Sequence, residues 1–249
     1  MSASEHAEPD SQPSTTQAPE GAVAILLATD SPLVWEPLLG RALLAWAVAA
    51  FESANDVAQV MLVVSPDRTQ VAEALSQSER WTKTRIASAR DGWHEALLAG
   101  VGVVEGGELA GSATDQLVVV HEAARPLVTV DLIAATLAAA RKSGASMAGE
   151  PVKETIKRVR DGRIVGTVPR NQLVRAQTPL VFSLRVLRAT LATSSADAAT
   201  PSPMALVSHV LATGAPVSFI SSSPENLLVR TAADLAVAAA LLQRRTSAR

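Results

Sequence analysis

The sequence contains no cysteine among its 249 residues. It therefore forms no disulfide and offers no thiolate as a nucleophile or as a metal ligand, so any bound metal must be held by oxygen atoms or histidines. A chain without cysteine fits a reducing compartment, and we predict that the protein is cytoplasmic.

The chain also lacks an excess of charge of either sign. Lysine and arginine number 22 against 24 acidic residues, and the formal net charge is −2. This balance gives no basic surface of the kind that nucleic acids and anionic membranes attract, so we predict neither as a partner. The alanine-rich apolar stretch at residues 234–242 is far shorter than the roughly 20 residues that span a bilayer.

Several motifs are missing. The sequence has no Gly-x-Gly-x-x-Gly for a dinucleotide, no P-loop and no Gly-x-Ser-x-Gly nucleophile elbow. The four histidines lie too far apart in the sequence to indicate a metal cluster, and we expect His121 to be packed or hydrogen-bonded rather than catalytic. Residues 1–20 have neither the basic start nor the apolar core of a signal peptide. We predict a disordered tail over residues 1–20 and a single domain over residues 21–249.

From residue 21 onwards, short apolar runs alternate with longer helical patterns. The runs predict strands at residues 22–28, 57–64, 85–89, 116–121, 146–152 and 217–221. Apolar residues at three- and four-residue spacing predict helices at residues 38–53, 67–77, 91–104 and 129–143 and a final helix from Thr231, with Asp67, Asp91 and Thr129 as N-caps. This alternation is typical of βαβ units and predicts an α/β fold on a mostly parallel sheet.

A basic segment interrupts this pattern at residues 154–165. Two runs of alternating side chains are joined there by Asp161-Gly162, which is a strong signal for a β-hairpin. We predict that the hairpin, at about residues 153–170, protrudes from the sheet as a dimer arm or a lid.

The strand predicted at residues 116–121 ends in charged residues. Glu122 and Arg125 follow its apolar run directly. In a parallel α/β sheet, ligands bind in the crevice beyond the carboxyl ends of the strands, so a carboxylate and a guanidinium at this place indicate a functional site.

Three motifs in this order resemble those of the 2-C-methyl-D-erythritol 4-phosphate cytidylyltransferase family. They are Val120-His121-Glu122-Ala123-Ala124-Arg125-Pro126, Glu154-Thr155-Ile156-Lys157-Arg158, and Pro169-Arg170-Asn171-Gln172-Leu173 followed by Ala176-Gln177-Thr178-Pro179. The resemblance implies a Rossmann-like nucleotidyltransferase fold with flanking helices and a protruding β-hairpin arm that clasps a second subunit. It also implies transfer of CMP from CTP to a phosphorylated polyol in isoprenoid biosynthesis, with release of pyrophosphate.

The resemblance also implies roles for particular residues. Arg125 and Lys157 stand at catalytic positions, and Arg90, Thr155 and Arg170 at substrate-binding positions. Glu122 and Glu225 stand where the family has aspartates, which implies Mg²⁺ binding, because carboxylate oxygens suit that ion. Two other interpretations stay open: Glu122 pairs with Arg125 or a helix end, and the charged residues of the hairpin form a solvated face.

The sequence departs from the family where the triphosphate is expected. The loop after the first strand has no glycine and no cation, and leucines stand at two family lysine positions, Leu33 and Leu228. We interpret the loop as an ordinary strand-to-helix turn capped by Asp30 or Ser31, with phosphate binding by its backbone amides as the alternative. Trp93 replaces a serine of the base pocket, as a core residue or as a plug.

Two hypotheses follow from these departures. One is a nucleotidyltransferase in which cytidylyl transfer is weak or absent. The other is a catalytically silent homologue that acts as a binding or regulatory partner.

Overall fold

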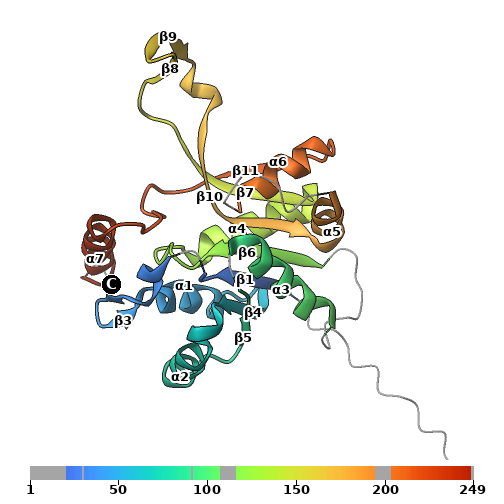
Figure 1. The fold of residues 1–249 in the computed structure, drawn as a ribbon, viewed down its shortest axis with the longest axis vertical. Coiled ribbons are helices and arrows are strands. Elements are labelled where there is room, and N and C mark those ends of the chain that lie inside the picture. The colour runs from blue at the N-terminus through green and yellow to red at the C-terminus, as the bar shows by residue number, and fades with distance from the viewer. Residues whose placement is uncertain (1–20, 30, 91, 107–115, 194–202, 248–249) are drawn as a thin grey trace, which may run out of the picture.

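A computed structural model of the protein describes residues 21–29, 31–90, 92–106, 116–193 and 203–247 (Figure 1). The predicted tail over residues 1–20 lies outside this part of the chain. The described residues form a central sheet with helices on both faces, an arm that protrudes from the sheet, and a C-terminal helix at one side. No helix in these ranges is long and apolar enough to cross a membrane.

The central sheet contains seven strands within the described residues, in the order β11-β7-β10-β6-β1-β4-β5. They are β1 (Ala22–Leu27), β4 (Val57–Val64), β5 (Thr84–Ser88), β6 (Leu117–Glu122), β7 (Ala145–Pro151), β10 (Val174–Ser183) and β11 (Ser218–Ser221). Strand β10 is antiparallel to both β6 and β7, and the other neighbouring pairs are parallel. The predicted α/β fold on a mostly parallel sheet is confirmed.

The inner strands are apolar at almost every position because helices cover both faces of the sheet. All six residues of β1 are buried. Their side chains alternate between two cores, with Ala24 and Leu26 on one face and Ile25 and Leu27 on the other. A run of apolar residues without alternation is therefore the pattern that this buried position requires.

The helices divide between the two faces. Helices α1 (Leu43–Glu52), α2 (Thr69–Glu79) and α4 (Val130–Ser143) pack on the face of Leu26. Helices α3 (Gly92–Gly106), α5 (Leu184–Thr193) and α6 (Ala205–Ala212) cover the face of Ile25. Helix α7 (Ala232–Ser247) lies to one side and packs on a smaller cluster that includes Leu127 and Val229.

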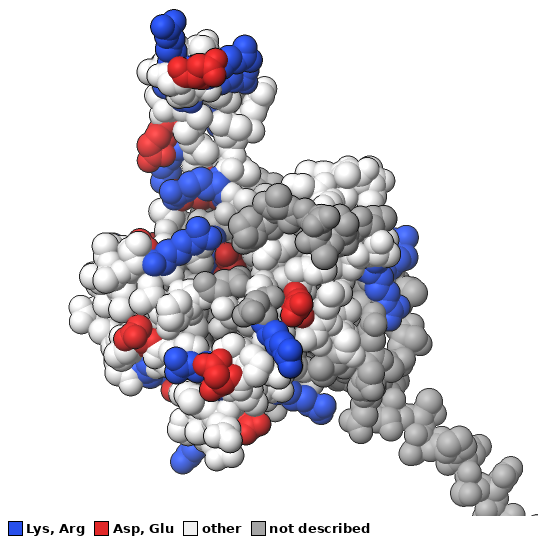
Figure 2. All heavy atoms as spheres, in the orientation of Figure 1, with Lys and Arg blue, Asp and Glu red and all other residues white. Residues whose placement is uncertain are grey.

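The predicted hairpin is confirmed as strands β8 (Ile156–Arg160) and β9 (Arg163–Val168). Asp161 and Gly162 connect them with φ angles of 48° and 73°, as a type I′ turn requires. The two strands pair with each other and stand clear of the central sheet (Figure 1). We call residues 153–170 the arm. Lysine and arginine side chains gather along it (Figure 2).

Some predicted boundaries are wrong for identifiable reasons. Helix α1 begins at Leu43 rather than at residue 38, because Leu39 and Gly40 adopt positive φ and turn the chain between two short strands, β2 (Pro37–Leu38) and β3 (Arg41–Ala42). Asp67 lies inside a short 3-10 helix, Pro66–Arg68, and does not cap α2. The predicted cap Asp91 lies outside the described residues. Thr129 is confirmed as an N-cap, since its side chain accepts from Leu132 N.

Strand β10 was not predicted. It contains the Gln177-Thr178-Pro179 segment, which the resemblance to the family leads one to expect as a turn. Proline lacks the N–H that a strand ladder uses. The pairing with β7 shifts register between Gln177 and Leu180, and the strand continues on both sides of that shift.

Candidate active site

The candidate site lies where β1 and β6 end side by side. Strands β4 and β5 follow β1 outward in one direction, whereas β6 pairs with the other edge of β1, so the order in which strands are added to the sheet reverses there. Ligands of open α/β sheets bind in the crevice at such a point. A cavity of about 370 Å³ opens there, lined by Leu27, Ser31, Pro32, Val34, Glu122, Ala124, Pro203, Leu228, Val229 and Arg230.

Glu122 and Arg125 form a nearly buried ion pair beside this cavity. Arg125 Nε donates to Glu122 Oε2 at 2.8 Å, and the side chains of Arg125 and Glu122 are 8% and 13% exposed. Arg125 Nη1 also donates to the carbonyl oxygen of Asn226 at 2.8 Å. The pairing left open by the sequence is therefore present. It cancels the charge of Glu122 and ties the chain after β6 to the segment that precedes α7.

Asn226 is the centre of a buried polar network that sequence reasoning missed. Its Nδ2 donates to Gln177 Oε1 and to the carbonyl oxygen of Thr178, both at 2.9 Å. Thr178 Oγ1 accepts from Glu122 N at 3.2 Å. The network holds the end of β6 and the middle of β10 against Asn226 in the segment before α7. In the sequence, the one feature that pointed to Asn226 was its position directly after Glu225, a predicted metal ligand.

Glu225 faces a different set of partners. Arg245 Nη2 and Nε donate to its Oε2 at 2.9 and 3.1 Å, and Arg244 donates to its other oxygen. Both arginines belong to α7. Glu122 is thus the one carboxylate among the described residues that line the cavity. No group of three or more His, Asp or Glu side chains within the described ranges is placed to hold a metal ion.

After β1, the described residues 31–35 form a capped turn. Ser31 Oγ accepts from Leu33 N at 3.2 Å, and Pro32 opens a short 3-10 helix, Pro32–Trp35. Leu33 packs towards the cluster under α7 rather than lining the cavity. Because the amide of Leu33 is already bonded to the cap, the geometry supports the interpretation as a turn with Ser31 as its cap. Asp30 lies outside the described residues.

Trp93 is a core residue. Its side chain is 7% exposed and packs with Leu27 and Met61 on the face of the sheet that α3 covers. The interpretation as core packing is supported. Arg90 lies exposed in the loop between β5 and α3 and does not line the cavity.

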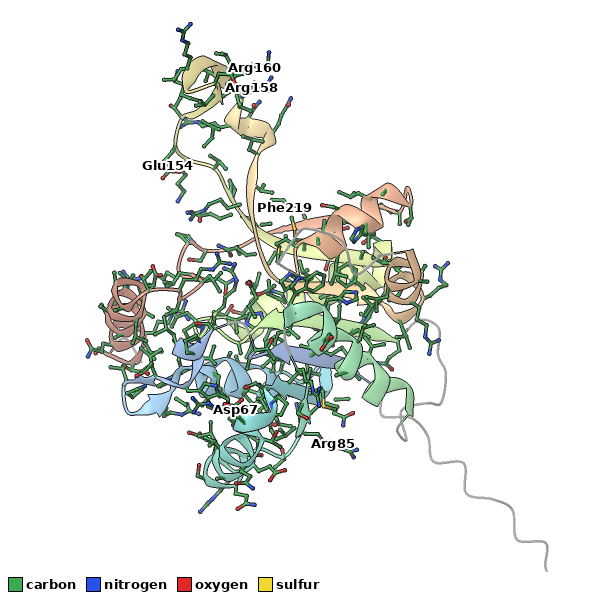
Figure 3. All side chains as sticks on the ribbon, viewed as in Figure 1. Asp67, Arg85, Glu154, Arg158, Arg160 and Phe219 are labelled. Carbon is green, nitrogen blue, oxygen red and sulfur yellow. The ribbon has the colours of Figure 1, made fainter. Side chains whose placement is uncertain are left out.

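The remaining predicted residues belong to the arm. Thr155 and Lys157 are exposed, and Lys157 Nζ donates to Thr167 Oγ1 at 2.8 Å across the hairpin. Arg170 is exposed and donates to the carbonyl oxygen of Lys153. None of the three lines the cavity. Figure 3 shows their neighbours Glu154, Arg158 and Arg160 out on the arm, so a single chain does not bring the two halves of the predicted site together.

His121, the residue before Glu122, is fully buried and uncharged. Burial, followed by repulsion from Arg125, lowers its pKa from the ordinary 6.5 to about 3. Its Nε2 lies 3.4 Å from the carbonyl oxygen of Arg125, and its ring packs on Phe51 with centroids 5.1 Å apart. These contacts agree with the expectation that His121 is a packed residue.

The sheet order, the crevice beyond β1 and β6, and the arm together define the class of the protein as an α/β nucleotidyltransferase fold. Comparisons with known proteins agree. The family model for 2-C-methyl-D-erythritol 4-phosphate cytidylyltransferase matches residues 23–244. The chain is 34% identical to the protein of that name from Cereibacter sphaeroides over 220 residues, which cover 86% of this chain and 89% of that protein.

Solved structures show the same fold. A crystal structure of a 4-diphosphocytidyl-2C-methyl-D-erythritol synthase superposes with a TM-score of 0.75 at 23% identity, over 90% of this chain and 99% of the other. The 2-C-methyl-D-erythritol 4-phosphate cytidylyltransferase from Thermus thermophilus gives a TM-score of 0.67 at 26% identity, over 90% and 99% of the two chains. The chain belongs to the 2-C-methyl-D-erythritol 4-phosphate cytidylyltransferase family.

Proposed function

We propose that this protein transfers CMP from CTP to a phosphorylated polyol, slowly compared with other members of its family. The observation that carries the proposal is the cavity at the ends of β1 and β6, in a chain that belongs to this family. An oxygen of the acceptor phosphate attacks the α-phosphorus of CTP. The new P–O bond forms as the bond between the α-phosphorus and the bridging oxygen breaks, and pyrophosphate leaves with the electron pair.

The low rate follows from the charges around the cavity. Phosphoryl-type transfers depend mainly on positioning and on cations that stabilise charge on the phosphate oxygens. Here Arg125 is engaged by Glu122 and by a backbone carbonyl, and Leu228 lines the cavity where the family places a lysine. The described lining residues supply one cation without a carboxylate partner, Arg230.

We further propose that the arm clasps a second copy of the chain. A two-stranded hairpin on its own is at best marginally stable in water. Ile164 is 69% exposed and Val165 is 54% exposed, so the arm presents apolar side chains as well as cations. In such a dimer Thr155, Lys157 and Arg170 of one chain would meet the acceptor phosphate in the cavity of the other.

Binding of Mg²⁺ stays a prediction. In the observed arrangement Glu122 and Glu225 do not share a site, because the first pairs with Arg125 and the second with two arginines of α7. The residues present do not fit the ion without rearrangement. No step of the proposed mechanism is therefore routed through a metal.

The second candidate is a catalytically silent homologue that binds a phosphorylated ligand or a partner chain. Leu228 in the cavity and the capped turn after β1 favour it, since both remove phosphate-binding groups expected in the family. Arm and fold would be retained for binding alone.

Release of pyrophosphate separates the two candidates. The assay uses CTP, 2-C-methyl-D-erythritol 4-phosphate and MgCl₂, with a reaction lacking acceptor as the control. Slow release that depends on the acceptor supports the transferase. Absence of release, together with calorimetric binding of the acceptor that weakens in Arg170→Ala, supports the silent homologue.

A further inference from the structure

Arg230 lines the cavity together with Leu228, two residues before it. Residues 227–230 belong to no helix or strand. Val229, between them, is fully buried in the cluster under α7, whereas Leu228 and Arg230 both line the cavity.

The backbone around Arg230 is fixed on both sides. Val229 N donates to the carbonyl oxygen of Ala124 at 2.9 Å, which holds the segment to the end of β6. Arg230 N donates to Asp234 Oδ2 at 3.0 Å. Thr231 and Asp234 exchange hydrogen bonds as a capping box at the start of α7. The guanidinium therefore extends from an anchored position.

The charge of Arg230 is uncompensated within the described part of the chain. Arg125, Arg244 and Arg245 all pair with carboxylates. Arg230 is exposed, and no ion pair joins its side chain to a described residue. Since Arg125 already neutralises Glu122, the charged side chains described at the cavity leave one net positive charge, which favours an anion.

We propose that Arg230 binds the phosphate chain of a nucleoside triphosphate in this cavity. It takes over, from a position two residues further along the lining of the same cavity, the role of the cation that Leu228 does not supply. A guanidinium presents several donors in a planar fork and binds phosphate oxygens bidentately. The inference rests on the proposed function and identifies the residue that holds the pyrophosphate leaving group.

Binding of inorganic tripolyphosphate tests the inference without requiring a base or an acceptor. Isothermal titration calorimetry at low salt should show that the full-length chain binds the probe and that Arg230→Ala binds at least tenfold more weakly. Arg85→Ala is the matched control, because Arg85 (labelled in Figure 3) is an exposed arginine of the edge strand β5 and does not line the cavity. Its affinity should equal that of the unaltered chain.

A rescue variant separates lost charge from a general disturbance. Leu228→Lys in the Arg230→Ala background should restore affinity to within about threefold, because the lysine stem can keep the apolar packing of Leu228 while its amine enters the cavity. Arg230→Lys should fall between the unaltered chain and Arg230→Ala. Melting curves confirm that each variant is folded. Equal affinity of Arg230→Ala and the unaltered chain would overturn the inference, as would no binding of tripolyphosphate by the unaltered chain.

The pyrophosphate-release assay distinguishes this inference from the proposed function. If tripolyphosphate binding depends on Arg230 but no acceptor-dependent release occurs, the inference holds and the transferase proposal fails. If release occurs at the same rate in Arg230→Ala, the transferase proposal holds and the inference fails.

Discussion

The cavity and the arm differ in how their charges are used. Beside the cavity, Arg125 is engaged with the carboxylate of Glu122 and with the carbonyl oxygen of Asn226, and it joins segments distant in the sequence. On the arm, Lys157, Arg158, Arg160 and Arg163 are exposed on a hairpin that contacts little else (Figures 1 and 2). Arg125 therefore stabilises the fold, whereas the cations on the arm, like Arg230 in the cavity, remain available to a ligand or a partner.

The largest expected effect comes from breaking the buried pair. Arg125→Ala should lower the free energy of unfolding by about 3–5 kcal/mol, because Glu122 is left as an unpaired charge with little access to water. Urea unfolding measures it. Arg160→Ala on the arm should change stability by less than about 0.5 kcal/mol. The double variant Glu122→Gln, Arg125→Met should lose less unfolding free energy than Arg125→Ala, because it leaves no unpaired charge. An equal loss in both variants would show that the unpaired charge is not the cause of the destabilisation.

The next effect is on pH dependence. Because burial lowers the pKa of His121 to about 3, the unfolded chain takes up the proton first as the pH falls below 6.5. Stability from this residue is complete above pH 6.5 and declines by about 1.4 kcal/mol per pH unit below it, until the folded pKa is reached. His121→Phe should flatten the curve of unfolding free energy between pH 6.5 and pH 5, relative to the unaltered chain. If the slope of unfolding free energy against pH is unchanged in His121→Phe, His121 is not the source of this pH dependence.

A smaller effect concerns assembly. If the arm clasps a second copy, Ile164→Ala should raise the dimer dissociation constant about tenfold, equivalent to roughly 1.4 kcal/mol of lost apolar burial. Sedimentation equilibrium measures the constant. Leu211→Ala, at an exposed leucine of α6, serves as the control. A mass of one chain at all concentrations would contradict the arm as a dimer contact.

The smallest effect is expected at the end of α7. Arg244→Ala should change the free energy of unfolding by less than about 1 kcal/mol, since its side chain is 66% exposed and such pairs contribute little. Arg245→Ala should be more destabilising, because Arg245 is less exposed and also donates to the carbonyl oxygen of Leu127 at 2.9 Å. Chemical denaturation of both variants compares them directly. The reverse order would contradict the assignment of Arg245 as the anchor.

Patterns that depend on local chemistry were predictable from the sequence. The apolar runs of β1 and β6, the Asp161-Gly162 turn and the Thr129 cap all depend on neighbouring residues. Strand β10 was not predictable in this way, because Pro179 opposes a strand locally and pairing with β6 and β7 overrides it. In such a segment, tertiary contacts rather than local sequence determine the secondary structure.

The candidate site divides in the same way. The place of Glu122 at the end of a buried strand was predictable, but its partner was not, since the sequence equally allowed a metal, a helix end or Arg125. Arg230 was missed because its relation to Leu228 requires knowing that both residues line the cavity while Val229 between them is buried. Which side chains share a face becomes visible only when the backbone is placed.

We propose that transfer is slow because the cavity has too few cations. The most direct measurement compares the steady-state rate of pyrophosphate release, with CTP and 2-C-methyl-D-erythritol 4-phosphate, between the unaltered chain and Leu228→Lys. We expect slow release by the unaltered chain and a kcat/KM at least tenfold higher in Leu228→Lys, because a second cation enters the cavity beside Arg230. Fast turnover by the unaltered chain with no gain in Leu228→Lys would contradict it.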